Sequence, residues 1–232
     1  MKLESLPQQD TAIIVHAGAA RLEGTLTIPP GATSLVMFAH GSGSSRLSPR
    51  NRYVAQVLND GGIATLLFDL LSPEEERIDA MTRELRFDIT LLAARLTGAI
   101  DWAAIHEATR HLRIGLFGAS TGAAAALIAA ARRPGLVRAV VSRGGRPDLA
   151  DHALPLVQAP VLLIVGGDDH AVLQLNEQAR RRMRSRARIE IIPGANHLFE
   201  EPGTLERAAR LASVWFQEKL DSMLENGDVV TR

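Results

Sequence analysis

The sequence contains no cysteine, and this absence removes three kinds of chemistry at once. Disulfide bonds, thiolate metal sites and a cysteine nucleophile are all excluded. An excess of one charge sign is also absent, because 26 lysine and arginine residues balance 26 aspartate and glutamate residues. A chain without net charge creates no overall field that attracts nucleic acid or an anionic membrane. We therefore expect neither of them as a partner.

Long apolar runs are absent as well. No stretch is long enough to span a bilayer, and the first ten residues, MKLESLPQQD, lack the apolar segment of a secretory signal. These features favour a cytoplasmic protein. Because 46% of the 232 residues are hydrophobic, the chain can build one sizeable core, so we expect a single domain over residues 1–232. Within it, residues 225–232 are expected to form a frayed tail.

Lysine is scarce, since Lys2 and Lys219 are the only examples and nearly all positive charge is arginine. Several arginines gather close together in one segment: Arg180, Arg181, Arg182, Arg184, Arg186 and Arg188. A basic cluster of this kind could bind nucleic acid or another anion. We interpret it as a solvated helix face, because no aromatic side chains are interleaved with the arginines.

Apolar segments alternate with amphipathic segments along the chain. Residues 11–29 predict two antiparallel strands around Gly18. Further strands are predicted at 34–40, 63–71, 112–117, 136–142, 159–166 and 187–194, and helices at 50–60, around 87–100 and at 121–133, 171–184 and 203–224. The segment with Pro73 and three consecutive glutamates is predicted to be a polar loop. This order indicates an α/β fold whose mostly parallel sheet has about eight strands and helices on both faces.

One motif falls where a strand gives way to a helix, the position at which α/β sheets gather their reactive groups. Residues 118–122, GASTG, match the pattern G-x-S-x-G. A nucleophilic serine needs a very tight turn there, and glycines tolerate such a turn. The helix that follows points backbone N–H groups toward a developing oxyanion. Ser120 is therefore the candidate nucleophile, rather than a simple helix cap.

A serine nucleophile needs a base, and His197 is the candidate among seven histidines. It follows the last predicted strand, and it completes the chain order serine, aspartate, histidine. His170 follows the preceding strand but begins a helix. The other candidates are interpreted as surface or core residues: His16, His106, His111 and His152. His40 is expected to brace the loop that it begins.

The acid that orients the histidine is expected after the strand at 159–166. Asp168 and Asp169 both follow the Gly-Gly turn there, and their position alone leaves the choice between them open. Asp148 and Asp151, on the loop after the strand at 136–142, are weaker candidates.

An oxyanion site should take one backbone N–H from Thr121 and another from the loop after the strand at 34–40. That loop reads HGSGSS, which makes Ser42 the expected donor and Gly43 the alternative. A phosphate-binding loop is disfavoured, because the third glycine of G-x-G-x-x-G is missing and no Gly-Lys-Ser/Thr follows.

The resemblance of the chain to a known family rests on four motifs in order: FAHGSGSSR, GASTG, VGGDD and GANHLFEEPG. Over nearly its whole length it resembles the α/β-hydrolase superfamily, in detail the dienelactone-hydrolase-like branch. The resemblance implies Asp169 as the acid and His197 as the base. True dienelactone hydrolases use cysteine where this chain has Ser120, which favours ordinary serine-ester chemistry. Similar bacterial proteins are sometimes joined to a phosphoribosyltransferase-like domain, for which we expect no room here.

The expected function is that of a serine hydrolase acting on a small carboxylic ester, lactone or thioester. An acyltransferase, perhydrolase or carbon–carbon bond hydrolase on the same scaffold, or a non-catalytic ligand-binding protein, are the alternatives. No cofactor or metal is implied, and the chain is expected to act as a monomer or homodimer. The segment 143–158 is too short for a cap domain. Apolar walls of an open site are therefore expected from Leu70, Leu71, Leu198 and Phe199.

Overall fold

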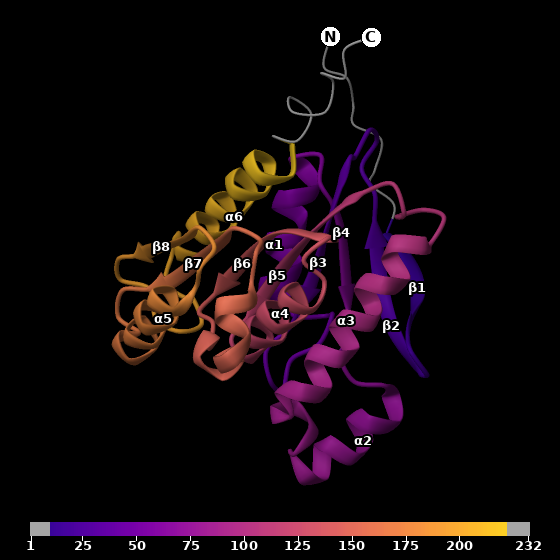
Figure 1. Ribbon diagram of the computed structural model, residues 1–232, viewed down its shortest axis with the longest axis horizontal. Coiled ribbons are helices and arrows are strands. Elements are labelled where there is room, and N and C mark those ends of the chain that lie inside the picture. Colours follow the sequence, from indigo (N-terminus) through magenta and orange to yellow (C-terminus); the bar gives the residue numbers. More distant parts are fainter. Residues whose placement is uncertain (1–9, 222–232) are drawn as a thin grey trace.

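The computed structural model describes residues 10–221, and their strands form one twisted sheet with helices on both faces (Figure 1). The predicted tail at 225–232 lies outside the described residues. The strands are β1 (Asp10–Ala17), β2 (Ala20–Thr27), β3 (Ser34–Ala39), β4 (Ala64–Phe68), β5 (Arg113–Ala119), β6 (Val137–Arg143), β7 (Val161–Gly166) and β8 (Ala187–Ile192).

The sheet has eight strands in the order β1-β2-β4-β3-β5-β6-β7-β8. Only β2 runs against its neighbours, because it pairs antiparallel with both β1 and β4. The pairs from β4 to β8 are all parallel. The predicted hairpin around Gly18 and the mostly parallel sheet are therefore confirmed. As in other α/β sheets, the carboxyl ends of the parallel strands meet at one edge.

Two layers of helices enclose the sheet. The longer elements are α1 (Pro49–Asp60), α2 (Pro73–Thr82), α3 (Ile89–Ile105), α4 (Thr121–Arg132), α5 (His170–Arg182) and α6 (Thr204–Asp221). Helices α3, α4 and α5 pack on the face toward the viewer in Figure 1, and α1 and α6 pack on the opposite face.

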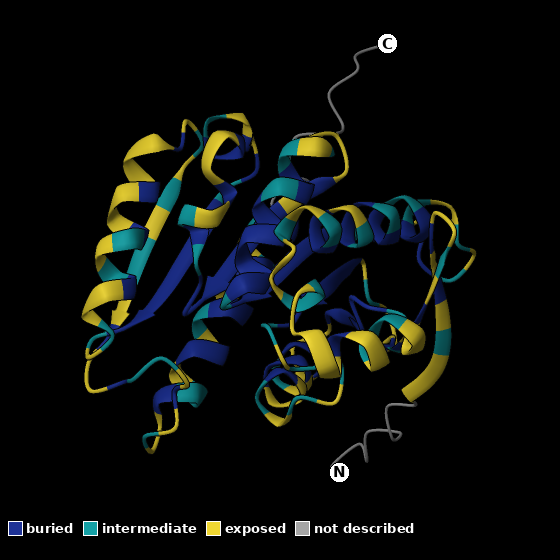
Figure 2. Ribbon diagram, turned by 90° about the horizontal axis from the view of Figure 1, so that it is seen from below, coloured by how far each residue is buried: buried dark blue, intermediate teal, exposed yellow. Residues whose placement is uncertain are grey.

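The central strands are predominantly apolar because both of their faces are covered. On β3, Leu35 and Met37 belong to the core beneath α3 and α4, whereas Val36 and Phe38 belong to the core beneath α1 and α6. All four side chains are buried. Figure 2 shows the same pattern, with buried strands at the centre and exposed residues on the outer faces of the helices, the loops and the edge strands. This rigid centre supports the loops at the carboxyl edge.

The structure departs from the sequence prediction at several points near that edge: β4 ends at Phe68 and β5 ends at Ala119, against predicted ends at 71 and 117. Residues 73–82 form helix α2 rather than a polar loop. Ser72 and Glu75 make a reciprocal capping box, and Pro73 occupies the first turn. Strand β6 continues to Arg143, one residue beyond the predicted end. Pairing of Arg143 with Ala119 of β5 explains the extension.

The connection from β6 to β7 contains only the short 3-10 segment η2 (Pro147–Leu156). A cap domain is therefore absent there, as predicted. Among residues 10–221, no helix combines the length and apolar character needed to cross a membrane. The arginines between positions 180 and 188 are all exposed, but they lie on the end of α5, the following turn and β8, not on one helix face.

Candidate active site

Ser120 stands on the sharp turn between β5 and α4. Its backbone has φ 51° and ψ −122°, a strained conformation for a residue with a side chain. Close packing makes this turn depend on glycine. A Cβ atom on Gly122 would lie 2.2 Å from the Ala39 carbonyl oxygen, and one on Gly118 would lie 2.4 Å from the Cα atom of Ala123. The motif thus fixes a strained serine at the carboxyl edge of the sheet.

His197 lies on the loop after β8 and contacts Ser120 across the sheet edge. Its Nε2 atom is 3.3 Å from Ser120 Oγ, and its Nδ1 atom is 2.7 Å from Asp169 Oδ2. Because an ionised carboxylate only accepts hydrogen bonds, Nδ1 carries the proton and donates a hydrogen bond to Asp169. Nε2 is then the acceptor for the Ser120 hydroxyl. The structure thus brings the three expected side chains into one chain of hydrogen bonds.

The other three candidate acids do not contact His197. Asp168 is exposed, whereas Asp169 immediately precedes α5 and turns toward His197. Asp148 is paired with Arg146 at 2.8 Å, and Asp151 is paired with Arg182 at 2.7 Å. Of the four acids considered from the sequence, only Asp169 contacts the imidazole.

The loop that carries His197 is held by its own side chains. The Asn196 carboxamide oxygen accepts hydrogen bonds from the backbone N–H groups of Leu198 and Phe199, at 2.7 and 2.9 Å. This turn places Phe199 at φ 57° and buries its ring in the core beneath α6. The imidazole is therefore presented from a tightly braced segment.

His40 braces the opposite loop, which follows β3. Its Nε2 atom accepts a hydrogen bond from the Leu70 backbone N–H at 3.1 Å, so its Nδ1 atom carries the proton and donates to the Gly41 carbonyl at 3.0 Å. Burial lowers the pKa of His40, although its bond to Gly41 and the Asp69 charge act in the other direction. A neutral imidazole thus links the loop to the end of β4.

The two residues expected to supply the oxyanion donors contact each other. Thr121 is the first residue of α4, so its backbone N–H has no acceptor within the helix. The backbone N–H of Ser42 donates to the Thr121 hydroxyl oxygen at 2.8 Å. Gly43, the alternative donor, has φ 70° within a turn closed by a 3.1 Å bond from the Ser44 N–H to the Gly41 carbonyl.

A cavity of about 260 Å³ opens beside Ser120 and His197. Most of the residues that line it have polar side chains, among them Ser42, Ser44, Ser48, Arg50, Asn51 and Arg143, and Leu198 is its large apolar member. The expected apolar wall is therefore wrong in most of its members. Leu198 lines the cavity, but Leu70, Leu71 and Phe199 are buried in the two cores. Their apolar side chains are used to pack the sheet instead.

Three polar members of this wall, two of them charged, were not predicted from the sequence. Arg143 is the last residue of β6, and Arg50 and Asn51 lie in the first turn of α1. The one available signal was an arginine directly after a buried strand and before Gly144-Gly145. It is the same kind of position, the carboxyl end of a parallel strand, that identified Ser120 at the end of β5.

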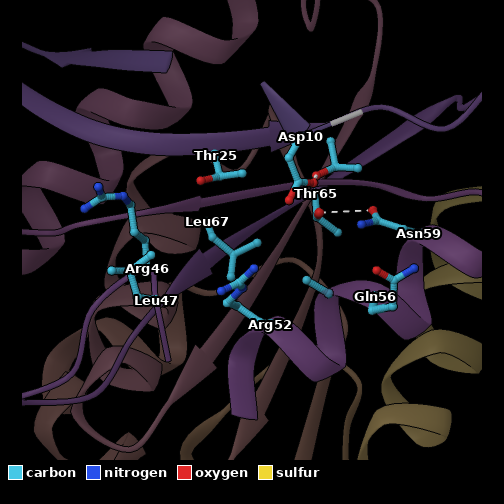
Figure 3. A pocket seen from close by; sticks show the side chains of 11 residues that line it. Asp10, Thr25, Arg46, Leu47, Arg52, Gln56, Asn59, Thr65 and Leu67 are labelled. Carbon is cyan, nitrogen blue, oxygen red and sulfur yellow. Dashed lines mark hydrogen bonds between the residues drawn. The ribbon is translucent and has the colours of Figure 1, made fainter. Parts of the chain in front are cut away.

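A second cavity, of about 130 Å³, lies between β2, β4 and α1 (Figure 3). It shares no lining residue with the cavity at Ser120. Its wall combines Asp10, Arg46 and Arg52 with several hydroxyl and amide side chains. Across residues 10–221, no group of three or more histidine, aspartate or glutamate side chains is arranged to hold a metal ion.

Comparison with known proteins places the chain in a hydrolase family. Residues 27–221 match the dienelactone hydrolase family. A crystal structure of a protein named dienelactone hydrolase from Anabaena variabilis is 60% identical and superimposes with a TM-score of 0.91, covering 92% of this chain and 99% of that chain. An α/β serine hydrolase without a lid from Xanthomonas campestris shares the fold, with a TM-score of 0.71 and 18% identity over 93% and 97% of the two chains.

Curated relatives are longer than this chain. Two Mycobacterium tuberculosis proteins, each named "Putative phosphoribosyl transferase", are 55% identical over 214 residues. The match covers 92% of this chain but 47% of each relative. The chain therefore spans about half the length of these proteins. Their name describes the full-length proteins and is not transferred to this chain.

Proposed function

Because this chain belongs to the dienelactone hydrolase family, we propose that it is a serine hydrolase that cleaves a small carboxylic ester, lactone or thioester. One observation carries the proposal. His197 contacts the Ser120 hydroxyl through Nε2 and the Asp169 carboxylate through Nδ1, at 3.3 and 2.7 Å. This is the relation that a hydroxyl nucleophile, a general base and an orienting acid require.

Ser120 is the proposed nucleophile. Its oxygen attacks the carbonyl carbon while His197 Nε2 takes the hydroxyl proton. The 3.3 Å separation is long for this hydrogen bond, and such contacts commonly shorten once substrate is bound. Asp169 keeps the proton on Nδ1 and stabilises the imidazolium that forms. The serine turn requires no rearrangement for the attack, because its backbone strain already lifts the side chain above the sheet edge.

The backbone N–H groups of Thr121 and Ser42 are proposed to stabilise the tetrahedral oxyanion. In the free protein the Ser42 N–H donates a hydrogen bond to the Thr121 hydroxyl oxygen. When substrate binds, its carbonyl oxygen replaces that hydroxyl as the acceptor. The Thr121 hydroxyl thus satisfies the Ser42 N–H group until the substrate arrives. The N-terminus of α4 adds the favourable end of its helix dipole.

In the later steps His197 first gives its proton to the leaving group and then takes one from water. The C–O or C–S bond of the substrate breaks as the leaving alkoxide or thiolate takes the proton from His197. An acyl group then remains on Ser120. Water, deprotonated by His197, attacks this acyl-enzyme, and the acid product leaves with the proton returned to Ser120 Oγ.

A fluorophosphonate probe tests the proposal, because it reacts with an activated serine hydroxyl far faster than with ordinary ones. We expect one label, located on the peptide that contains Ser120 by mass spectrometry. Ser120→Ala should abolish labelling, whereas Ser44→Ala, which alters another serine of the same cavity, should keep it. A folded protein that remains unlabelled, or is labelled elsewhere, would contradict the proposed nucleophile. A panel of short esters, lactones and thioesters then separates the substrate classes.

A further inference from the structure

Strand β8 is the last strand at one edge of the sheet (Figure 1). It pairs with β7, and among residues 10–221 no strand lies on its other side. The carbonyl oxygens of Arg186 and Ile192, at its two ends, accept backbone hydrogen bonds from the β7 side at 2.9 and 2.8 Å. Because backbone groups alternate in direction along a strand, every second residue between these two turns its N–H and C=O groups away from the sheet. These residues are Ala187, Ile189 and Ile191.

This edge lacks the features that usually protect an open strand. Its sequence, ARIEII, contains no proline and no lysine, and its pairing with β7 has no register shift. The two charged residues of the strand, Arg188 and Glu190, have opposite signs and form an ion pair with each other. A row of like charges repels a second copy of the same strand, whereas a pair of opposite charges does not. The edge is therefore open to pairing with another strand.

Charge selects the antiparallel register in which two copies of β8 can pair. A two-fold axis through Arg188 sets two guanidinium groups opposite each other, and an axis through Glu190 sets two carboxylates opposite each other. An axis through Ile189 instead sets Arg188 opposite Glu190 of the second copy, twice. Directly opposed side chains of opposite charge stabilise a strand pair, and like charges destabilise it. Of these three registers, only the one centred on Ile189 is favourable.

The register centred on Ile189 also satisfies the open backbone groups. Ile189 exchanges two hydrogen bonds with Ile189 of the second copy, and Ala187 pairs in the same way with Ile191. Ile191 is 43% exposed in the single chain, and the second copy covers it. A groove of about 500 Å³ lies between β8 and α5, and Ile189 and Ile191 are among its lining residues. Opposed side chains share one face of a sheet, so the grooves of the two copies adjoin.

The arginines close to β8 do not oppose this pairing. Arg184 and Arg186 lie just before the strand begins, and Arg180 and Arg181 lie near the end of α5. Antiparallel pairing sets the start of β8 in one copy beside its carboxyl end in the other. The basic segments of the two copies therefore lie at opposite ends of the paired region.

We propose that two copies of this chain associate through β8, with the strands antiparallel and the two-fold axis at Ile189, so that the two sheets become one. The inference does not rest on the proposed hydrolase activity, because no residue of β8 lines the cavity at Ser120. The paired segment is only six residues long, so the interface is small. We expect a dissociation constant in the micromolar range.

Charge reversal tests the register. Arg188→Glu leaves two carboxylates on the strand and Glu190→Arg leaves two guanidinium groups, so each variant alone should raise the dissociation constant of its dimer by about 10-fold or more. Mixing the two variants should restore association, because each opposed pair then has opposite signs. Arg188→Glu/Glu190→Arg should associate as the wild type does. Sedimentation velocity over a concentration series measures each dissociation constant.

Arg21→Glu is the matched control for charge. It reverses an exposed arginine on β2, near the other edge of the sheet, and it should change the dissociation constant by less than about two-fold. A wild-type chain that stays monomeric up to about 0.5 mM would overturn the inference. So would a dimer that neither reversal at β8 weakens, because its contact then lies elsewhere. A mixture that associates no better than its two components would reject the register. Circular dichroism spectra check that each variant is folded.

A single thiol provides a second test of the axis, since the chain contains no cysteine. Ile189→Cys places two thiols at the proposed axis, where the Cα atoms of directly opposed residues are about 5.5 Å apart. A short bis-maleimide should join them into a covalent dimer. Ile14→Cys, which replaces an exposed isoleucine on the opposite edge strand β1, should give no such product. Cross-linking of Ile14→Cys but not of Ile189→Cys would move the contact to β1 and overturn the inference. If Ile189→Cys fails to fold, the mixing experiment decides.

Discussion

The cavity at Ser120 and the cavity in Figure 3 are both lined by arginine, hydroxyl and amide side chains, yet their polar groups are satisfied to different degrees. In the Figure 3 cavity, Arg46 is paired with Glu23 and Asp69, and Thr65 donates to the Asn59 carboxamide oxygen at 3.0 Å. In the Ser120 cavity, Arg143 has no carboxylate partner among the described residues.

Backbone geometry separates the two cavities as well. The Ser120 turn is strained at φ 51°, whereas none of the residues that line the Figure 3 cavity has a positive φ. A cavity whose polar groups satisfy one another contributes to folding. A cavity that keeps a strained hydroxyl and an unpaired cation retains groups for a ligand to complete. Substitutions in the two cavities should therefore affect different measurements.

Ser120→Ala is expected to have the largest effect. Removal of the proposed nucleophile should lower kcat for ester hydrolysis on the order of 10⁴-fold or more, because no acyl-enzyme can form. The variant should keep the circular dichroism spectrum and melting curve of the wild type. Retention of more than a few per cent of the activity would assign the chemistry to another group.

Asp169→Asn is expected to be nearly as damaging. Loss of the carboxylate removes the partner that keeps the proton on His197 Nδ1, which can lower kcat by around 10⁴-fold. Asp168→Asn is the matched control, since it changes the adjacent exposed acid, and its cost should stay below about 10-fold. Steady-state kinetics of both variants with one ester decides between them. The reverse ranking would move the acid to Asp168.

Acyl chain length should have a smaller effect that depends on the cavity wall. A chain that finds an apolar wall gains about 0.8 kcal/mol for each buried methylene, which raises kcat/KM several-fold per carbon. With Leu198 as the one large apolar side chain of this cavity, we expect no such rise beyond about four carbons. p-Nitrophenyl esters from acetate to decanoate measure the trend. Faster turnover of the long chains would show that another apolar surface accommodates them.

Thr65→Val should separate the two cavities with the smallest effect. The change removes the buried hydrogen bond to Asn59 in the Figure 3 cavity, so the free energy of unfolding should fall by about 1 kcal/mol. Urea denaturation measures this loss. The value of kcat should stay within about two-fold of the wild type. A large fall in kcat would mean that the two cavities are coupled.

Much of the fold was predictable because local sequence reports local structure. The covered strands are continuous apolar runs, and Gly18 marks the first hairpin at φ 63°. The capping box at Ser72 was readable in the same way, but the three glutamates were interpreted as a loop although acidic residues favour the first turn of a helix. The apolar wall was predicted wrongly because burial depends on what packs above each leucine.

The sequence by itself determined where the proposed nucleophile and base stand, since a glycine-flanked serine after a strand and a histidine after the last strand are fixed by local backbone geometry. Position in the sequence left the choice of aspartate open, and the tertiary structure shows that Asp169 faces His197, as the family resemblance implied. Only the tertiary structure decided which group accepts from the Ser42 N–H, and that Arg143 lies buried with no carboxylate partner among the described residues. Each of these depends on residues 28 to 92 positions apart in the chain. The register of neighbouring strands and the packing of α1 and α4 bring these distant residues together. Register and packing each depend on several segments at once, so no single segment of the sequence predicts them.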